Sequence, residues 1–483
     1  MIPILSGNVA SATADAGYTV ANSCRFDRAS SAYMAITPSA GNRRTWTFST
    51  WVKKSSLTGN QDLITSGTAE AVVSYIYFYS SARIFAFEEY SGGYQIHMKS
   101  NAYLRDMSAW YNLIVAVDTT QGTDSNRIKM YINGTQTSFS TSTYPSENFE
   151  CNINSNTLHN IGCEQNGTNC IDGYLAETVF IDGLQLGADS FGEFDSDSPT
   201  IWKPIDVSGL TFGTNGFYLD FEDSADLGAD VSGNSNDLTE TNLAATDQTT
   251  DTPTNNFATF NPLHQSTYHA TSRAVLAEGN TKWTGTSDYT SQNGILATMG
   301  MSTGKWYLEA KWAGTYDAII AVAKDDFGMM TAGTGGLQSA GWYGMNTNIS
   351  ATGGAGIAWW SDNSATGDRG STISSNDIIM MAIDIDNSKL YFGLNGTWEE
   401  SGDPTSGATG TGATSTLASN TTYLVACANY GYSTANSFEL NFGNPLYAIS
   451  SGNADADGYG NFEYAVPSGY YALCTKNLGA YGG

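Results

Sequence analysis

The chain has 483 residues, more than one hydrophobic core usually holds, so its length predicts two domains with connecting segments. It carries 47 Asp and Glu against 20 Lys and Arg, which gives a net charge of -27. This charge repels phosphate backbones and anionic lipids, and no apolar run approaches the about 20 residues that span a bilayer, so we expect no nucleic-acid binding and no membrane insertion.

Residues 1–21 are small and polar and predict an N-terminal arm rather than a domain. They lack the basic start and the long apolar segment of a signal peptide, so we expect synthesis in the cytoplasm. Cysteines stay reduced in that compartment, which favours free, buried thiols. Cys163 and Cys170 could close a small loop under oxidising conditions, and that alternative stays open. The six cysteines are Cys24, Cys151, Cys163, Cys170, Cys427 and Cys474.

Residues 22–197 alternate apolar and polar side chains in many short runs, which predicts an antiparallel sheet protein. The clearest pair of strands is 113–118 and 127–132. The first strand ends on an aspartate, and the second carries Lys-x-Tyr before an Asn-Gly pair that tolerates the backbone of a tight turn. We therefore predict a first β-sandwich over 22–197.

Residues 198–265 are dominated by turn formers and predict an extended connector that docks on its neighbours. The next region, 266–446, repeats the design of the first sandwich. Its strand at 377–386 places Ile379, Met381 and Ile383 on one face, and Asp384 on the opposite, polar face.

A second Lys-x-Tyr strand, 389–394, follows before Asn395-Gly396, so we predict a hairpin and a second sandwich over 266–446. Residues 447–483 fade into Gly and Ala and predict a C-terminal tail. By strand parity four tryptophans are expected in the cores: Trp46, Trp51, Trp110 and Trp306.

The motifs of the first sandwich occur in a characteristic order. A Trp-rich strand comes first, followed by Trp-Tyr-Asn-Leu at 110–113, Tyr-Ile-Asn-Gly at 131–134 and Gly-Tyr-Leu-Ala-Glu at 173–177. This set resembles a laminin G-like, concanavalin-type domain. In the second sandwich, Gly-Lys-Trp-Tyr-Leu-Glu at 304–309, the hairpin and Phe-Glu-Leu-Asn-Phe-Gly at 438–443 resemble the SPRY domain. The resemblance implies an all-β protein of two concanavalin-like antiparallel β-sandwiches of jelly-roll type, joined by the connector.

The connector contains Asp-Thr-Pro-Thr-Asn-Asn-Phe at 251–257, and the C-terminal region contains Tyr-Tyr-Ala-Leu-Cys-Thr at 470–475. With these motifs, the whole arrangement resembles tail-fibre or other virion proteins of bacteriophages. This implies a non-enzymatic virion surface protein that recognises a host-surface glycan or protein. Its partners would be other virion subunits and the host surface, with assembly in the host cytoplasm. A homotrimer or another symmetric oligomer is expected, because linked weak sites gain avidity. Two alternatives stay open, a structural decoration of capsid or tail and a glycan-degrading enzyme.

Catalysis is not expected. Some glucanases of the concanavalin type use a Glu-x-Asp-x-x-Glu strand, whose carboxylates serve as nucleophile and acid/base. The nearest match begins Glu193-Phe194-Asp195 but carries Ser198 where the last carboxylate should stand. We interpret this stretch as a solvated acidic loop.

No cofactor is expected, although structural calcium is possible because hard acidic oxygens are plentiful. Two short acidic stretches have part of a calcium-loop pattern. Their candidate ligands are Asp230, Asn234 and Asp237, and Asp455 and Asp457.

Sugar binding needs exposed aromatic rings beside polar groups, because a ring covers the apolar face of a sugar while polar groups bind its hydroxyls. Trp359 and Trp360 are adjacent in a predicted strand, so one of them must point out of the core. The candidate ligand-binding residues are Trp342, Tyr343, Trp359, Trp360, Tyr430 and Tyr432 in the second sandwich, and Tyr90 and Tyr94 in the first.

Overall fold

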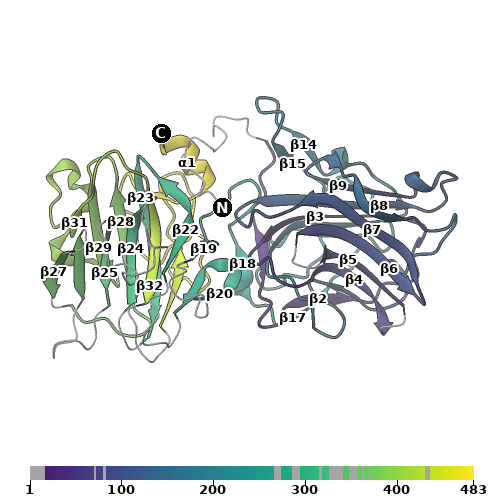
Figure 1. Ribbon diagram of the computed structural model, residues 1–483, viewed down its shortest axis with the longest axis horizontal. Coiled ribbons are helices and arrows are strands. Elements are labelled where there is room, and N and C mark those ends of the chain that lie inside the picture. The colour runs from purple at the N-terminus through teal and green to yellow at the C-terminus, as the bar shows by residue number, and fades with distance from the viewer. Residues whose placement is uncertain are drawn as a thin grey trace. The chain divides into compact units, whose positions relative to one another are not determined.

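The computed structural model describes residues 17–69, 72–79, 83–265, 274–285, 294–314, 318–325, 341–347, 357–361, 364–368, 371–429 and 436–482. Its contacts divide the chain into a first unit, Ala14–Thr254, and a second unit, Asn255–Gly483. Each unit consists of layered, largely antiparallel strands (Figure 1), which confirms the predicted all-β class and the two β-sandwiches. Among the described residues the one α-helix is α1 (Thr475–Tyr481), and none is long and apolar enough to cross a membrane.

The first unit packs two eight-stranded sheets around one core. Trp46 from one sheet meets Phe87 from the other, with ring centroids 5.6 Å apart. In sheet order, the first sheet contains β10 (Thr135–Gln136), β9 (Ile128–Ile132), β8 (Trp110–Asp118), β3 (Thr45–Lys54), β13 (Gly173–Asp182), β1 (Ser23–Phe26) and β18 (Gln248–Thr249), with β16 (Phe217–Leu219) also on β13. The second contains β11 (Phe139–Thr143), β7 (Tyr94–Tyr103), β6 (Ile84–Ser91), β5 (Val72–Tyr79), β4 (Gln61–Ala69), β12 (His159–Ile161), β2 (Tyr33–Ile36) and β17 (Thr239–Thr241).

The outer face of the first sheet is covered by the chain itself. Residues that follow β13 pack on it and form an apolar cluster with Ile114, Val179 and Ile181. This covering segment includes a two-stranded sheet of β14 (Gly192–Phe194) and β15 (Trp202–Pro204). Trp51 and Trp110 lie in a second cluster on this outer face, so both are buried as predicted, but under a covering segment and not between the sheets.

Much of the segment expected to be a connector therefore belongs to the first unit. β16, β17 and β18 each pair with a strand of its two sheets, and the division between units falls after Thr254. Turn-rich sequence predicted a connector docked on its neighbours, and its scattered apolar residues, such as Phe212 and Leu238, are buried against the first sandwich.

The start of the described chain is anchored on the first unit by a buried glutamate. Tyr18 and Tyr218 each donate a hydrogen bond from the phenol to Oε2 of Glu177, at 3.0 and 2.8 Å. Burial raises the pKa of Glu177 to about 7, although the two phenols favour its charged form. These bonds tie the last residues of the predicted arm to β13.

The second unit also packs two sheets around one core. Trp359 stacks on Phe392 of the opposite sheet with centroids 5.3 Å apart. Its first sheet contains, in order, β19 (Phe260–Gln265), β22 (Gly294–Met301), β32 (Tyr423–Asn429), β24 (Ala318–Lys324), β25 (Trp342–Asn346), β26 (Ala358–Ser361) and β27 (Ser364–Asp368). Its second contains β20 (Val275–Ala277), β21 (Lys282–Thr284), β33 (Ser437–Asn441), β23 (Lys305–Ala313), β28 (Ile378–Asp384), β29 (Lys389–Leu394) and β30 (Thr397–Trp398), with β31 (Ser415–Thr416) on β29 and β34 (Tyr471–Ala472) on β23.

Both predicted Lys-x-Tyr hairpins are confirmed as β8–β9 and β28–β29. The prediction of a polar outer face on β28 is wrong. Met380 and Ala382 are as buried as Ile379 and Met381 on the other face. Asp384 is fully buried and pairs with Lys305 at 3.1 Å.

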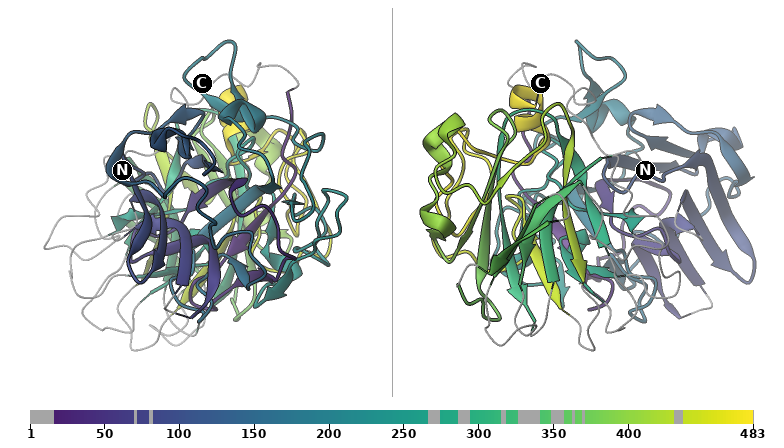
Figure 2. Two further views of the ribbon diagram at one scale, coloured as in Figure 1. Left: turned by 90° about the vertical axis from the view of Figure 1, so that its right-hand side faces the viewer. Right: turned by 60° about the vertical axis from the view of Figure 1, so that its left-hand side comes forward.

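The second face of this sheet is buried because the C-terminal segment covers it. Phe462 packs edge-on against Tyr307 of β23, with centroids 5.0 Å apart, and β34 adds to the edge of the same strand. The predicted tail therefore carries core residues of the second unit. Helix α1, at the C-terminal end of the chain, is the yellow helix beside the label C in Figure 2.

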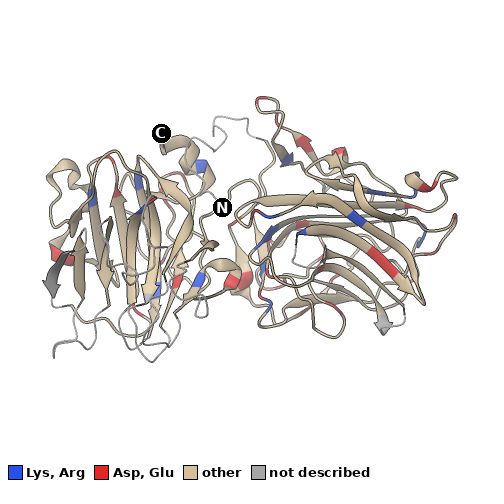
Figure 3. Ribbon diagram, viewed as in Figure 1, with Lys and Arg blue, Asp and Glu red and all other residues tan. Residues whose placement is uncertain are grey.

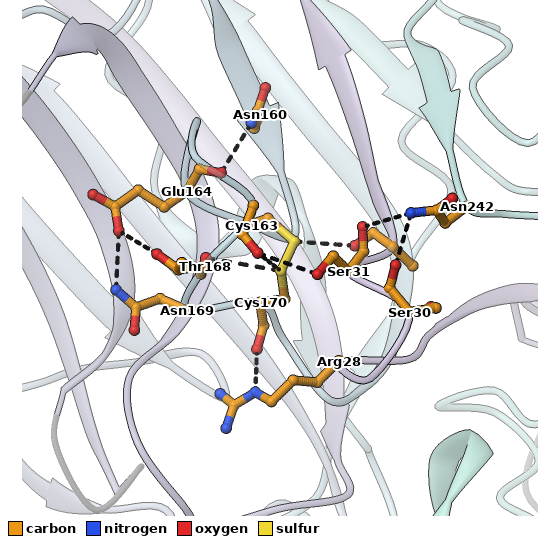
Figure 4. Close-up of a disulfide and its surroundings, with 12 residues drawn as sticks. Arg28, Ser30, Ser31, Asn160, Cys163, Glu164, Thr168, Asn169, Cys170 and Asn242 are labelled. Atoms are coloured by element: carbon orange, nitrogen blue, oxygen red, sulfur yellow. Dashed lines mark hydrogen bonds between the residues drawn. A yellow bond between two sulfur atoms is a disulfide. The ribbon is translucent and has the colours of Figure 1, made fainter.

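Cys163 and Cys170 form a disulfide (Figure 4), which is the alternative that the sequence left open beside free thiols for this pair. The other four cysteines are buried and free, as predicted. The disulfide closes a short loop between β12 and β13. Oxidation at this position is possible because the two Cα atoms lie 4.0 Å apart.

Replacing both cysteines, Cys163→Ser with Cys170→Ser, should lower the free energy of unfolding of the first unit by about 2 kcal/mol, as expected for a cross-link of a short loop. Calorimetry of the full chain with and without reductant would measure this. The variant should match the reduced wild type and should not respond to reductant. An unchanged melting temperature in the variant would contradict a stabilising disulfide.

Candidate functional site

The outer face of β5, β6 and β7 in the first unit carries a concentration of tyrosines. β5 has the sequence Val-Val-Ser-Tyr-Ile-Tyr-Phe-Tyr, in which Ile76 and Phe78 point into the core. The alternating tyrosines therefore share the outer face. We call this surface the tyrosine face and define it by Tyr75, Tyr77, Tyr79, Tyr90, Tyr94, Glu88, His97 and Lys99.

Three of these rings are open to solvent. Tyr79, Tyr90 and Tyr94 are 36, 40 and 50% exposed. Tyr90 and Tyr94 meet edge to face with centroids 5.6 Å apart, and Tyr94 stacks on the ring of His97 at 4.2 Å. Two predicted binding residues thus lie together in an exposed aromatic group.

A charged network runs through the middle of the tyrosine face. Oε1 of Glu88 lies 3.2 Å from Nε2 of His97 and 3.1 Å from Nζ of Lys99. The Lys99 ammonium lies 3.4 Å from the centroid of Tyr79, a cation–π contact. Burial, and then the charge of Glu88, raise the pKa of Tyr77, so its phenol stays protonated. The face therefore combines exposed rings with fixed hydrogen-bonding groups.

The dimensions of the face suit an extended ligand. Antiparallel pairing aligns Tyr79 with Ile84 at one end of β6, and Tyr90 lies near the other end. Six residues of strand span about 20 Å. In the ribbon of Figure 3, acidic and basic residues are interspersed along the strands and loops of both units.

The candidate binding residues of the second unit lie differently. Trp342, Tyr343 and Trp359 are 1, 4 and 1% exposed, so they present no ring face to solvent. Trp360 is half-buried on the outer side of its sheet and stacks on Trp342 at 5.6 Å, so the predicted opposite orientation of Trp359 and Trp360 is confirmed. Tyr430 and Tyr432 lie outside the described residues.

The candidate metal ligands are engaged by protein groups. Asp230 accepts hydrogen bonds from the backbone N–H groups of Tyr218, Ser232 and Asn236, and Asp237 accepts one from the N–H of Asp230. The amide of Asn234 donates to two carbonyls. These side chains therefore hold turns.

Asp455 similarly accepts from the N–H groups of Asp457, Tyr459 and Ala472, and Asp457 accepts from the phenol of Tyr481. In the described part of the chain no group of three or more His, Cys, Asp or Glu is arranged to hold a metal ion.

The acidic stretch weighed as a glucanase motif forms a surface turn. Glu193 and Asp195 lie 3.2 and 3.7 Å from the ammonium of Lys203, and Asp195 accepts from the N–H groups of Asp197 and Ser198. Its carboxylates are therefore engaged in holding β14, β15 and the turn between them.

The match to a family model supports the fold of the first unit. Residues 28–184 match the family model described as the concanavalin A-like lectin/glucanases superfamily. Among solved structures the chain is similar to the SPRY domain of human HERC1 (12% identity, 38% of this chain and 96% of that one, TM-score 0.26) and to the TRIM65 PSpry domain (11% identity, 38% and 88%, TM-score 0.26). No curated protein matches the chain.

Proposed function

We propose that this chain is a non-enzymatic recognition protein that binds glycan on the tyrosine face. The observation that carries the proposal is the exposed group of Tyr90, Tyr94 and His97 beside the Glu88–Lys99 pair. Exposed rings stack on the apolar faces of sugars, and the fixed charges accept or donate hydrogen bonds to hydroxyls. The family that matches residues 28–184 is named for lectins and glucanases, which supports a carbohydrate ligand.

We further propose that the protein acts on the surface of a bacteriophage virion, as a tail fibre or a related adhesin that attaches to the host. The order of the laminin G-like and SPRY-like motifs along the chain supports this role. A symmetric oligomer, such as a trimer, would repeat the tyrosine face and convert weak single-site binding into avid attachment. Locating the protein on purified particles by immunogold microscopy tests this setting.

A glycan array combined with a reducing-sugar assay on the full chain tests the recognition role. Selective binding without release of sugar supports it. Release of reducing sugar would replace it with a glycan-degrading enzyme. Absence of glycan binding would favour a structural decoration of capsid or tail.

Replacing both exposed tyrosines, Tyr90→Ala with Tyr94→Ala, should weaken binding of the glycan found on the array by about 30-fold or more, because stacking of each ring contributes about 1 kcal/mol or more. Isothermal titration calorimetry would measure the affinity. Phe194→Ala is the matched control, since this ring is 44% exposed in the same unit but lies outside the tyrosine face. Equal affinities for wild type and the double variant would contradict a ligand on this face.

A further inference from the structure

The disulfide-closed loop brings a carboxylate to the edge of the tyrosine face. The phenol of Tyr75 donates to Oε1 of Glu164 at 3.0 Å. The other carboxylate oxygen accepts from the hydroxyl of Thr168 at 3.1 Å and from the amide of Asn169 at 3.0 Å (Figure 4). The carbonyl of Asn169 in turn accepts from the backbone N–H of Asp62 at 2.9 Å. Glu164 is thus held in a fixed position beside β4 and β5.

Asp62, Tyr75, Tyr77 and Glu164 together form what we call the Glu164 corner. Asp62 is paired with Tyr77 across β4 and β5, so their side chains share the outer face. The rings of Tyr75 and Tyr77 lie 6.0 Å apart. Glu164 itself is half-buried, so a ligand that lies on the tyrosine face can reach this corner.

The charge of Glu164 is not neutralised by a bound side chain. Among the described residues Glu164 forms no ion pair, and its three partners are neutral donors. Asp62 is 1% exposed, and its Oδ2 has no hydrogen-bond partner. Burial, followed by the charge of Glu164, raises the pKa of Asp62 well above its usual range.

The nearest cation is already committed elsewhere. The guanidinium of Arg28 donates to the carbonyls of Cys170, Thr58 and Asn60 at 2.7, 2.8 and 2.5 Å. It holds the base of the loop. Glu88, by contrast, already has Lys99 and His97 as partners, whereas the partners of Glu164 are neutral donors.

We propose that the Glu164 corner is a subsite for a sugar residue that carries a free amino group, which makes amino sugars the preferred ligand class. The inference rests on the proposed glycan binding at the tyrosine face. A sugar ammonium is a compact donor that fits the half-exposed carboxylate of Glu164. The adjacent, partly exposed ring of Tyr75 favours a cation by cation–π attraction. An anionic sugar in the same place would be repelled.

The test compares two probes that differ only at the amino group, a β-1,4-linked tetramer of glucosamine and its fully N-acetylated form. Affinities are measured by calorimetric titration of the full chain at about pH 6, where the sugar amine is protonated. Salt at about 0.15 M screens the attraction of the amine to distant charges of the protein, so that contacts within the subsite dominate. Wild type should bind the amine form about tenfold more tightly than the acetylated form. Glu164→Gln should remove this preference and leave binding of the acetylated form unchanged.

Glu147→Gln is the matched control, because it changes the net charge equally at an exposed position outside the face, and it should keep the preference. Tyr75→Phe removes the phenol that orients Glu164 and should reduce the preference without abolishing it. Any one of three results overturns the amino-sugar subsite: the preference for the amine form survives in Glu164→Gln, the wild type binds the two probes equally, or the wild type binds neither probe. If the probes bind equally and Tyr90→Ala with Tyr94→Ala abolishes both, glycan binding stands and the subsite alone fails.

Discussion

Asp251→Ala should lower the free energy of unfolding of the first unit by about 4 kcal/mol, because it leaves a buried lysine without its counter-charge. Oδ2 of Asp251 lies 2.6 Å from Nζ of Lys53, and both side chains are at most 1% exposed. Oδ1 accepts from the indole N–H of Trp110 at 3.1 Å. Burial lowers the pKa of Lys53, and Asp251 opposes that shift, so the loss of the aspartate favours the neutral form of the buried amine.

Hydrogen–deuterium exchange of the full chain in increasing urea would follow peptides of the first unit separately. Glu150→Ala is the control, because its ion pairs with Arg43 and Arg44 are exposed and should contribute at most about 1 kcal/mol. Lys53→Met combined with Asp251→Leu should recover much of the stability, since it removes both buried charges. A change in Asp251→Ala no larger than in the control would show that the pair does not stabilise this unit.

The Lys53–Asp251 pair fixes a segment whose packing is not evident from its sequence. Asp251 lies in the part of the chain that sequence patterns assign to an extended connector, yet its carboxylate is anchored between β3 and β8. A Thr- and Asp-rich stretch has no periodicity that could reveal such a contact, because the partner lies 198 residues earlier in the chain. Alternation predicts strands, but it does not predict which irregular segment covers them.

The same reason accounts for the error on β28. Period two in that strand correctly predicts a hairpin and one buried face. It also predicts exposure of Asp384, which would hold only if the other face met solvent. The C-terminal segment buries that face, and Lys305 supplies the charge that Asp384 needs there.

The tyrosine face was partly within reach of the sequence. Tyr75, Tyr77 and Tyr79 share parity in a strand that alternation predicts, so their common face follows from β5 alone. Adding Glu88 and Lys99 requires the registers of β6 and β7, and these registers shift between Ile84 and Ala86 and between Glu89 and Tyr90. Bulges of this kind change which side chains become neighbours and leave no sequence signal strong enough to place them.

The tryptophans of the second unit show that strand parity does not predict which rings are exposed. The spacing of Trp342, Trp359 and Trp360 favours packing in the core or at its rim, but it does not say which of these rings meets solvent. Trp359 is buried in the main core of the second unit, and Trp342 is buried in a separate cluster on the outer side of its sheet. A local sequence pattern does not specify either kind of packing. Ring type alone therefore does not distinguish a surface aromatic residue from a core one, whereas the exposed fraction of the ring in the structure does.

The second large effect is expected from Glu309→Ala, which should lower the free energy of unfolding of the second unit by about 4 kcal/mol. Glu309 is fully buried on β23. Its Oε1 accepts from the N–H of Tyr464 at 2.8 Å and the phenol of Tyr307 at 3.0 Å, and its Oε2 accepts from the N–H of Glu463 at 2.9 Å and the amide of Asn441 at 3.3 Å. Alanine would leave two backbone N–H groups and two side-chain donors without this acceptor, and each bond to a charged group contributes about 1.5 kcal/mol or more.

The same substitution should also loosen the C-terminal segment, since Glu309 is the residue that binds its backbone at 463–464 to the sheet. Exchange in urea would show the destabilisation, and limited proteolysis would show new cleavage within 445–470. Glu439→Ala on the neighbouring strand is the matched control: its 3.0 Å ion pair with Lys282 is partly exposed and should contribute at most about 1 kcal/mol. If Glu309→Ala unfolds no earlier than this control, the covering of β23 by the C-terminal segment does not depend on the buried carboxylate, and apolar packing of residues such as Phe462 must hold it instead.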